Sequence, residues 1–477
     1  MSIRRREFIL GSLAMPVLAG CGTFGPFGRR PAFAFGVISD IHVTTPESTE
    51  KFRRALRYFR SRGADAVIVA GDLSDWGLKS GFRYVAAAWK EEMAGTEIVP
   101  LFCTGNHDYE GWWYGDMTLD MHVQGYSEDE ALVKLGMDRV WQEVFGEPFS
   151  LMRHRKVKGY DFISAEWEEM DKTHSEPRTA QWFREHASEL PKDRPFFFFR
   201  HEPIPDTVIG FAKKTEENLA LKEALKAFPN CIAFGGHTHW TLNDERSIWQ
   251  GGFTSIAVPS MEYTTLPKGP ENGRDVRNGK SVLGMPRIAN RAEGTEAQGY
   301  FVSVYADGST EVERHDFEAM EEAAPAWLIP SAASGRRPYV PEEHAKRTPV
   351  PAFAAGDALR IRSVNGDRRN GTWAIFYELR FPTAKAGGRV FDYEARVERE
   401  DGTSVGSKTF LSPAFHKLPS DEPAEQRFFY DAIDIPETGR YRFAIYPRNC
   451  FGATGKPILS RFFETKPGKD KAKGSPL

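Results

Sequence analysis

The sequence predicts an α/β domain followed by an all-β domain, and three patterns lead to this prediction. Short apolar runs alternate with amphipathic segments in the first half of the chain. Polar residues of the kinds that bind metals follow five of these runs. Beyond about residue 354 several runs alternate apolar and polar residues. That alternation is typical of antiparallel strands with one exposed face.

The composition excludes several classes of protein. The 477 residues carry 63 Lys and Arg against 66 Asp and Glu, and this balance argues against a protein that coats nucleic acid. A hydrophobic fraction of 40% with 13% aromatic residues argues against global disorder. Four cysteines are too few for a disulfide scaffold. No apolar run reaches the ~20 residues of a membrane span, so a multi-pass protein is excluded as well.

The N-terminus has the pattern of an export signal. Basic residues around Arg5 and Arg6 precede an apolar stretch over residues 8–19, and Leu18-Ala19-Gly20-Cys21 follows. The first part resembles a twin-arginine signal and the second a lipoprotein cleavage box. Residues 1–21 are therefore expected to direct export across a bacterial inner membrane, with a lipid anchor on Cys21 as the only membrane contact. The expected location is the periplasm or cell envelope. The alternative is a short N-terminal helix with a chance cysteine.

Five continuous apolar runs are predicted to be buried strands. A helix-like segment with apolar residues at Phe52, Ala55, Leu56 and Phe59 separates the first two. Continuous apolar runs separated by helices are typical of strands buried on both faces in an α/β sheet. Ligands of such sheets bind beyond the carboxyl ends of the strands. The five runs cover residues 33–38, 66–70, 98–103, 196–199 and 231–234.

Each run ends in at least one candidate metal ligand. Carboxylates, imidazoles and amide oxygens suit transition metals such as Fe, Mn, Zn or Co. Seven ligands are too many for one tetrahedral ion and suit two ions that share a bridging carboxylate, for which Asp72 is the candidate. Paired ions ~3.5–4 Å apart clamp a phosphoryl group during in-line attack. Neighbouring glycines (Gly71, Gly105 and Gly236) allow sharp turns or close approach there. The candidates are Asp40, His42, Asp72, Asn106, His201, His237 and His239.

Each motif alone also fits a structural interpretation. Asp-x-His and Gly-Asp after a strand are common in surface turns, and a single histidine before Glu-Pro is often structural. The prediction of a metal site therefore depends on all five motifs occurring in order, each after its own apolar run.

Taken together, the motifs resemble the calcineurin-like metallophosphoesterase superfamily over residues 33–316. The resemblance implies a four-layer αββα fold with two metals at the strand ends. One metal would take Asp40, His42 and His239, the other Asn106, His201 and His237, with Asp72 bridging them. A metal-bridging hydroxide would attack phosphorus. His107 would assist the phosphoryl group or the leaving oxygen, and Asp108 would orient it; a histidine suits general-acid chemistry.

The segment Gly71-Asp72-Leu73-Ser74-Asp75-Trp76-Gly77 resembles the branch of cyclic-nucleotide and glycerophosphodiester phosphodiesterases. Purple acid phosphatases carry a tyrosine ligand where this chain has Asp75. Protein phosphatases of this fold carry an arginine where it has Trp76. Asp75 itself either supports a neighbouring ligand or is structural.

Two insertions offer candidate substrate contacts. Aromatic residues at Tyr109, Trp112, Trp113 and Tyr114 would either stack on a substrate or pack a core, and the same alternatives hold for Trp240. The polar stretch 267–299 is predicted to be a long loop. Its Arg274, Arg277 and Lys280 would either meet an anionic substrate or form a solvated face.

The predicted domain organisation follows from these changes in pattern. The metallophosphoesterase domain is expected over residues 31–318 and an Ala-, Pro- and Ser-rich linker over 319–353. An immunoglobulin- or fibronectin-like sandwich is expected over 354–465, where Phe391, Tyr393 and Ala395 alternate with polar residues. Residues 466–477 are predicted to be a disordered tail.

The sequence thus predicts a binuclear metal-dependent hydrolase of a small phosphoester, with a phosphodiester favoured by the branch resemblance alone. One alternative is a phosphomonoesterase or nucleotide pyrophosphatase. A second, from another class, is a surface-anchored binding module with a vestigial metal site. The complete set of ligands argues against this second alternative.

Overall fold

The structure is a computed structural model that describes residues 30–109, 137–167, 175–209, 219–265, 291–292, 297–367, 373–435 and 438–465. The predictions for residues 1–21, for Trp112, Trp113 and Tyr114, for the basic residues of the 267–299 loop and for the C-terminal tail lie outside these ranges. Within them, every helix is too short or too polar to cross a membrane.

The first sheet contains three of the five predicted strands. β1, β2 and β3 run parallel to one another, and β12, β13 and β14 continue the sheet antiparallel beyond β1. Phe33 of β1 pairs with Val304 of β12, so strands far apart in the sequence lie side by side. The strands are β1 Phe33–Ile38, β2 Ala66–Ala70, β3 Val99–Cys103, β12 Gln298–Val304, β13 Thr310–Asp316 and β14 Glu321–Ile329.

The second sheet contains the other two predicted strands. Its order is β4-β5-β6-β7-β9-β8, with β5, β6, β7 and β9 parallel. The strands are β4 Met152–Val157, β5 Tyr160–Ala165, β6 Phe196–Arg200, β7 Cys231–Gly235, β8 Ile248–Gln250 and β9 Thr254–Ala257.

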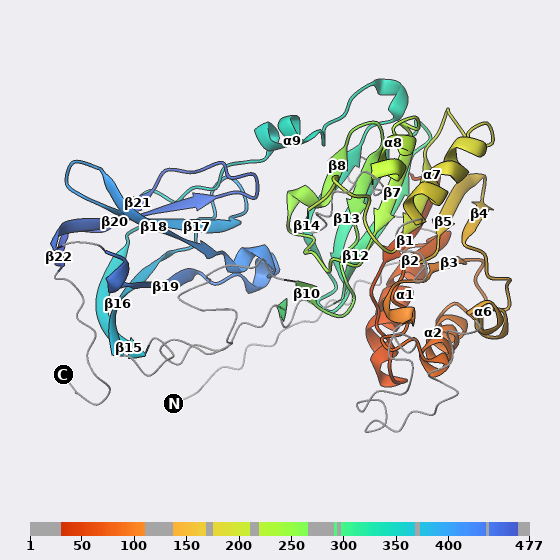
Figure 1. Cartoon of the computed structure of the whole chain (residues 1–477), viewed down its shortest axis with the longest axis horizontal. Helices are drawn as coiled ribbons and strands as arrows, with labels where there is room; N and C mark the ends of the chain where they lie inside the picture. Colours follow the sequence, from red (N-terminus) through yellow and green to blue (C-terminus); the bar gives the residue numbers. More distant parts are fainter. Residues whose placement is uncertain are drawn as a thin grey trace, which may run out of the picture.

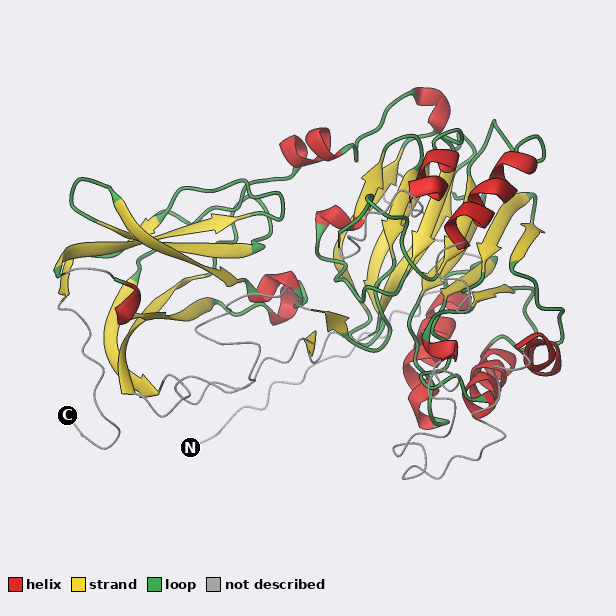
Figure 2. Ribbon diagram, viewed as in Figure 1, coloured by secondary structure: helices red, strands yellow, loops and turns green. Residues whose placement is uncertain are grey.

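The two sheets pack face to face, and helices cover their outer faces (Figures 1 and 2). Phe35 of β1 lies in the core between the sheets, with its ring centroid 4.6 Å from that of Phe197 on β6. Burial of each such ring contributes about 1.5–3 kcal/mol. The four-layer arrangement expected from the sequence is therefore present.

The helices match the apolar faces of the sheets. The apolar residues of α1 that the sequence indicated, from Phe52 to Phe59, are the ones it buries, against the first sheet. α2 and α6 cover the same sheet, while α7 and α8 cover the second. The helices are α1 Glu50–Ser61, α2 Lys79–Glu92, α6 Met137–Phe145, α7 Ser175–Glu185 and α8 Ala220–Leu225.

The C-terminal region is rich in β-strands, as expected. Its three-stranded and five-stranded sheets share one apolar core, which includes Phe381, Tyr393 and Phe443. Whether its topology is that of an immunoglobulin or fibronectin domain stays a prediction. The three-stranded sheet consists of β15 Arg360–Asp367, β16 Trp373–Pro382 and β19 Glu425–Asp431. The five-stranded sheet consists of β17 Asp392–Glu398, β18 Ser404–Leu411, β20 Gly439–Arg448, β21 Ile458–Leu459 and β22 Phe463–Thr465.

The predicted linker needs correction at its start. Residues 321–329 form β14, which pairs with β13 and buries Trp327 and Ile329. The composition of this segment, rich in Ala and Pro, is typical of a linker, but several of its apolar side chains are buried as those of a strand. The connection between the two regions therefore starts after Ile329 and includes α9, Pro341–Arg347 (Figure 1).

Candidate metal centre

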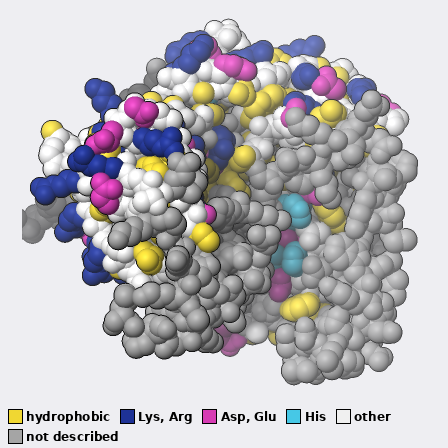
Figure 3. Space-filling view, turned by 60° about the vertical axis from the view of Figure 1, so that its left-hand side comes forward, with side chains coloured by type: hydrophobic (Ala, Val, Ile, Leu, Met, Phe, Trp, Pro, Cys, Tyr) yellow, Lys and Arg dark blue, Asp and Glu magenta, His cyan; other side chains and the backbone are white. Residues whose placement is uncertain are grey.

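The carboxyl ends of five strands meet where the two sheets come together. Notably, the ends belong to both sheets and not to one, because β1, β2 and β3 lie in the first and β6 and β7 in the second. All seven predicted metal ligands are described by the structure and all lie in the loops that follow these strands. Figure 3 shows histidine and acidic side chains gathered in a hollow of this surface.

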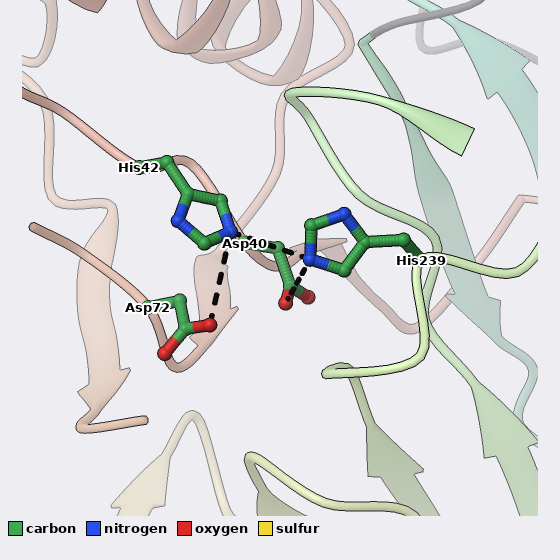
Figure 4. Close-up of side chains that lie close together, drawn as sticks. All are labelled: Asp40, His42, Asp72 and His239. Atoms are coloured by element: carbon green, nitrogen blue, oxygen red, sulfur yellow. Dashed lines mark hydrogen bonds and ion pairs between the residues drawn. The ribbon is translucent and has the colours of Figure 1, made fainter. Parts of the chain in front are cut away.

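Four of the seven form a first buried cluster (Figure 4). Nε2 of His239 lies 3.0 Å from Oδ1 of Asp40 and 3.3 Å from Nε2 of His42. Nε2 of His42 lies 3.7 Å from Oδ2 of Asp72. The two carboxylate residues are at most 1% exposed, so their charges are removed from water.

The other three form a second cluster that also borders Asp72. Oδ1 of Asn106 lies 3.0 Å from Nε2 of His201 and 2.9 Å from Nδ1 of His237. The two imidazole nitrogens lie 3.2 Å apart. Oδ2 of Asp72 is 3.2 Å from Nε2 of His201, so the same oxygen faces both clusters.

The tautomers of two histidines fit metal binding. Nδ1 of His201 lies 2.9 Å from the backbone oxygen of Ala70, and Nδ1 of His42 lies 2.9 Å from Oδ1 of Asp75. Since these oxygens only accept, each Nδ1 carries the proton. In the neutral ring Nε2 is then left as an acceptor that points into the cluster. Outer partners of this kind orient histidines that bind metals. Facing nitrogen lone pairs together with carboxylate and amide oxygens are a donor set that suits transition-metal cations.

The backbone at the site is strained. Five of the seven residues have left-handed φ values: 53° for Asp40, 45° for His42, 52° for Asp72, 66° for His237 and 50° for His239. This conformation costs a residue other than glycine about 1–3 kcal/mol, and surrounding contacts must impose it. Two such contacts are the hydrogen bonds from Asp40 N to Gly71 O and from His42 N to Asp72 O, at 3.1 and 3.0 Å.

The glycines beside the ligands have no room for a side chain, as the sequence suggested. A Cβ at Gly71 would overlap the ring of His201, and one at Gly105 would overlap the carboxylate of Asp72. At Gly236 it would overlap Ser39 and Asp40. The strand ends therefore approach one another as closely as backbone and ligands permit.

The charges in the clusters depend on one another. Burial opposes ionisation of Asp40, yet His239, His201 and His42 hold the pKa of its carboxyl well below the usual range. Burial opposes protonation of His201, yet Asp72 and Asp40 raise its pKa to about 9. Among the described residues the ion-pair partners of Asp40 and Asp72 are histidines. The site thus favours positive charge next to its two carboxylates.

His107 lies beside the first cluster, with its ring edge-on to that of His42 at 4.6 Å. Its Nδ1 lies 3.0 Å from the backbone oxygen of Asp75 and 3.3 Å from Oδ1 of the same residue. Of the two interpretations of Asp75, this geometry favours support of neighbouring functional side chains.

The expected role of Asp108 needs correction. Its carboxylate is fully buried and accepts hydrogen bonds from the backbone N–H groups of Leu73, Ser74 and Gly105, at 3.2, 2.7 and 2.8 Å. Burial, together with the charge of Asp72, raises the pKa of Asp108 to about 7. Asp108 therefore ties the loops after β2 and β3 together, while Asp75 is an acid that contacts the His107 ring among the described residues.

Two aromatic residues at the site were not indicated by the sequence. The ring of Tyr263 lies 4.0 Å from that of His239, and the ring of Trp167 stacks on His237 at 6.3 Å. Neither belongs to a motif, so only the three-dimensional structure brings them to the site. Of the aromatic residues that the sequence did indicate, Tyr109 is buried in the core of the first sheet and Trp240 packs on Phe415.

Residues 33–241 match the family model described as calcineurin-like phosphoesterase. This segment is thus similar to calcineurin-like phosphoesterases, and we refer to it, with the strands that complete its two sheets, as the phosphoesterase domain. Together with the buried Asp and His clusters at the strand ends, this match supports a phosphoester hydrolase. The match extends from β1 to just beyond His239, and so includes all seven predicted ligands.

The chain is also similar to solved structures. A dimetal phosphatase from Danio rerio has 13% identity and a TM-score of 0.34, over 63% of this chain and 99% of that one. GAP50, the anchor in the inner membrane complex of Plasmodium, has 12% identity and a TM-score of 0.37, over 63% and 89%. The purple acid phosphatase PPD1 of yellow lupin has 10% identity and a TM-score of 0.39, over 63% and 54%. A comparison with curated proteins found no match.

Proposed function

We propose that this protein is a binuclear metal-dependent phosphoester hydrolase that prefers phosphodiesters. The observation that supports this most directly is the shared position of Asp72, whose Oδ2 faces the imidazole of His42 in one cluster and that of His201 in the other. A carboxylate between two convergent sets of nitrogen and oxygen atoms suits two ions.

In this proposal, Asp40, His42 and His239 hold one ion, Asn106, His201 and His237 hold the other, and Asp72 serves both. Bound ions of Fe, Mn, Zn or Co would activate water and neutralise the charge of the phosphoryl oxygens. The remaining work falls to residues of the chain. The strained loops fix the ligand atoms before the metals arrive, which lowers the cost of ordering them on binding.

His107 is proposed to protonate the leaving oxygen. Asp75 contacts Nδ1 of this ring, through its backbone oxygen and its carboxylate. The proton on Nε2 is then the one transferred to the ester oxygen as the bond to phosphorus breaks. Asp75 also contacts His42, so it couples the position of the acid to that of a proposed ligand.

The preference for a diester is supported by the sequence from Gly71 to Gly77. Asp75 stands where purple acid phosphatases carry a tyrosine, and Trp76 stands where protein phosphatases of this fold carry an arginine. Export and anchoring through Cys21 are likewise proposed from the sequence pattern of residues 1–21. Replacement of Cys21 by alanine is expected to release the protein from membrane fractions, which immunoblotting of fractionated cells would measure.

The proposed activity is tested with an activated phosphodiester and the matching monoester. The chain without residues 1–21 is assayed with Mn, Zn and Fe supplied in turn, beside Asp72→Asn and a control variant, Glu394→Gln. Glu394 is a carboxylate of the C-terminal region that pairs with Arg396 at 2.9 Å. We expect metal-dependent turnover that Asp72→Asn reduces to background and Glu394→Gln leaves unchanged.

The ratio of diester to monoester turnover then decides the branch. A higher rate on the monoester would support the phosphatase alternative. Two bound ions without turnover of either ester would favour a binding module. A chain that cannot hold close to two ions would contradict the binuclear site itself.

A further inference from the structure

The loop that carries His237 and His239 contains two strained residues, with φ values of 66° and 50°. On its upstream side, His237 N donates to both carboxylate oxygens of Asp40, at 3.1 and 3.0 Å. Gly236 is packed against Ser39 and Asp40 there. The upstream half of the loop is therefore held by the phosphoesterase domain.

On its downstream side, the loop continues directly into a contact with the C-terminal region. Trp240 follows His239, and its ring lies edge-on to that of Phe415 at 5.4 Å. Phe415 is 2% exposed and packs in turn on Phe391, at 5.2 Å. Both phenylalanines belong to the C-terminal region.

Polar contacts fasten the same two segments. Nε1 of Trp240 donates to Asp244 at 2.9 Å, and Asp244 holds the guanidinium of Arg246 over the ring of Phe391. Nδ2 of Asn243 donates to the backbone oxygens of Ala414 and Lys417, at 3.2 and 3.0 Å. Residues 240–246 are thus attached to residues 412–417 by side chains from the phosphoesterase side.

Arg389 fastens them from the other side. Its Nε donates to Ala414 O at 2.8 Å, Nη2 donates to Lys417 O, and Nη1 reaches Ala323 O on β14 at 2.9 Å. One half-buried guanidinium therefore joins the segment around Phe415 to the first sheet of the phosphoesterase domain. The position of Phe415 relative to that domain is fixed by hydrogen bonds as well as by packing.

We propose that the C-terminal region is a positioning element of the metal centre, in which Phe415 acts through Trp240 to fix the backbone of His239. This inference rests on the proposed function, because it concerns the ion held by Asp40, His42 and His239. A strained residue keeps its conformation only where the surroundings over-determine it. For His239, Trp240 and the hydrogen bond from Thr265 N to His239 O, at 2.8 Å, supply that constraint.

The effect of losing this support is directional. Removal of the Phe415 ring gives Trp240 room to move, so the peptide at His239 relaxes and its imidazole leaves Asp40. His237 is less affected because its N–H is held by Asp40 within the phosphoesterase domain. The affinity of the first cluster for its ion is therefore reduced more than that of the second cluster.

The test compares Phe415→Ala with Phe429→Ala in the full chain. Phe429 is a matched control because it is 1% exposed in the same region, but it packs in a separate cluster with Ala374 and Phe376. Binding of Mn²⁺ to metal-free protein is measured by titration with electron paramagnetic resonance, which reports the number of ions and whether they are coupled.

We expect two coupled ions in the wild type and in Phe429→Ala. In Phe415→Ala, one ion keeps its affinity and the other binds about 10–100-fold more weakly, as for loss of residues that support metal ligands. Turnover lost at low Mn²⁺ returns at high Mn²⁺ because every proposed ligand is still present. A purely structural defect would not be rescued in this way.

Two equal, unchanged affinities in Phe415→Ala would overturn the inference and leave the proposed function standing. A wild type that holds fewer than two ions would contradict the proposed function, and the inference with it. Should Phe415→Ala fail to fold, Phe415→Leu and Phe429→Leu replace the pair. Equal ion binding in those two variants would also overturn the inference.

Discussion

The two regions of the chain use acidic residues in opposite ways. In the C-terminal region acids lie on the strand faces and pair with arginines: Asp392 with Arg448 at 2.6 Å and Glu398 with Arg442 at 2.9 Å. In the phosphoesterase domain, Asp40 and Asp72 are buried at strand ends, and their partners among the described residues are histidines. An arginine always carries its charge, whereas a histidine can give up its proton to bind a cation.

The two regions also differ in how many residues other than glycine have positive φ values. Five proposed ligands have left-handed φ values, whereas in the described residues after Met320 positive φ values are confined to glycine. The C-terminal region thus has relaxed strands and paired charges. In the other region, five of the nine described non-glycine residues with positive φ are proposed ligands, and its two site carboxylates are paired with histidines. This contrast indicates where a ligand is needed to complete the structure.

The largest effect of a single residue outside the proposed ligands is expected at His107. His107→Ala should lower kcat by about 10²–10⁴-fold, because it removes the proposed general acid. The number of bound ions should stay at two, since His107 is not among the proposed ligands. Steady-state kinetics beside metal analysis would check both. Loss of metal together with activity would instead show that His107 has a structural role.

Removal of metal is expected to lower the thermal stability of the phosphoesterase domain more than that of the C-terminal region. Ions that bind only the folded state stabilise it by about 2.7 kcal/mol at a hundredfold excess over Kd. Chelation should therefore lower the melting temperature of the phosphoesterase domain. Scanning calorimetry with and without chelator measures this. An equal shift in both regions would mean that the contact between them, and not the metal site, carries the effect.

Glu245 tests the comparison from within the phosphoesterase domain, because it follows the pattern of the C-terminal acids. Burial opposes its ionisation, but Arg314, then His344 and Trp327, lower its pKa to about 2. A lowered pKa stabilises the fold at pH values above the unfolded value near 4.5, and this contribution is lost as the pH falls toward 2. Glu245→Gln should reduce stability at pH 7 and flatten its decline between pH 4.5 and 2. Melting temperatures of the wild type and Glu245→Gln are measured at several pH values across that range. An equal decline of the two melting temperatures with falling pH would contradict this prediction.

The smallest effect is expected at Glu378, which pairs with Arg362 at 2.7 Å, with Arg380 at 3.1 Å and with Arg427. The side chains of these arginines are substantially exposed, so solvent screens the pairs. Glu378→Gln should cost about 1 kcal/mol in urea unfolding and less at high salt. Turnover should be unchanged, since Glu378 and its arginine partners are not among the residues proposed to bind metal or substrate. A lower turnover would show that the two regions are coupled through this sheet as well.

The sequence predicted those features that depend on neighbouring residues. β1, β2, β3, β6 and β7 were found because each is a continuous apolar run that ends in a turn. The proposed ligands could be predicted because each lies within a few residues of the end of its strand. The helix periodicity of Phe52 to Phe59 is equally local.

Features that depend on distant residues could not be found in this way. The division of the five strands between two sheets depends on pairings such as β1 with β12. Asp108 was expected to orient the neighbouring His107, but its side chain turns inward to the loop after β2, and Asp75 takes the place beside the ring. Tyr263 and Trp167 reach the site from segments without any motif. The contact of Trp240 with Phe415 crosses between regions whose relative position no local pattern specifies.

The position of β1 in the first sheet has a consequence for biosynthesis. β1 lies between β2 and β12, and it ends at Ile38 while β12 begins at Gln298. A chain emerging from the ribosome must therefore be extended through almost the whole domain before the strand that carries Asp40 has both neighbours. Contacts between such distant segments form late in folding. Nascent chains that stop before β12 should not retain a metal pair, so loading belongs to the time after this strand has been made.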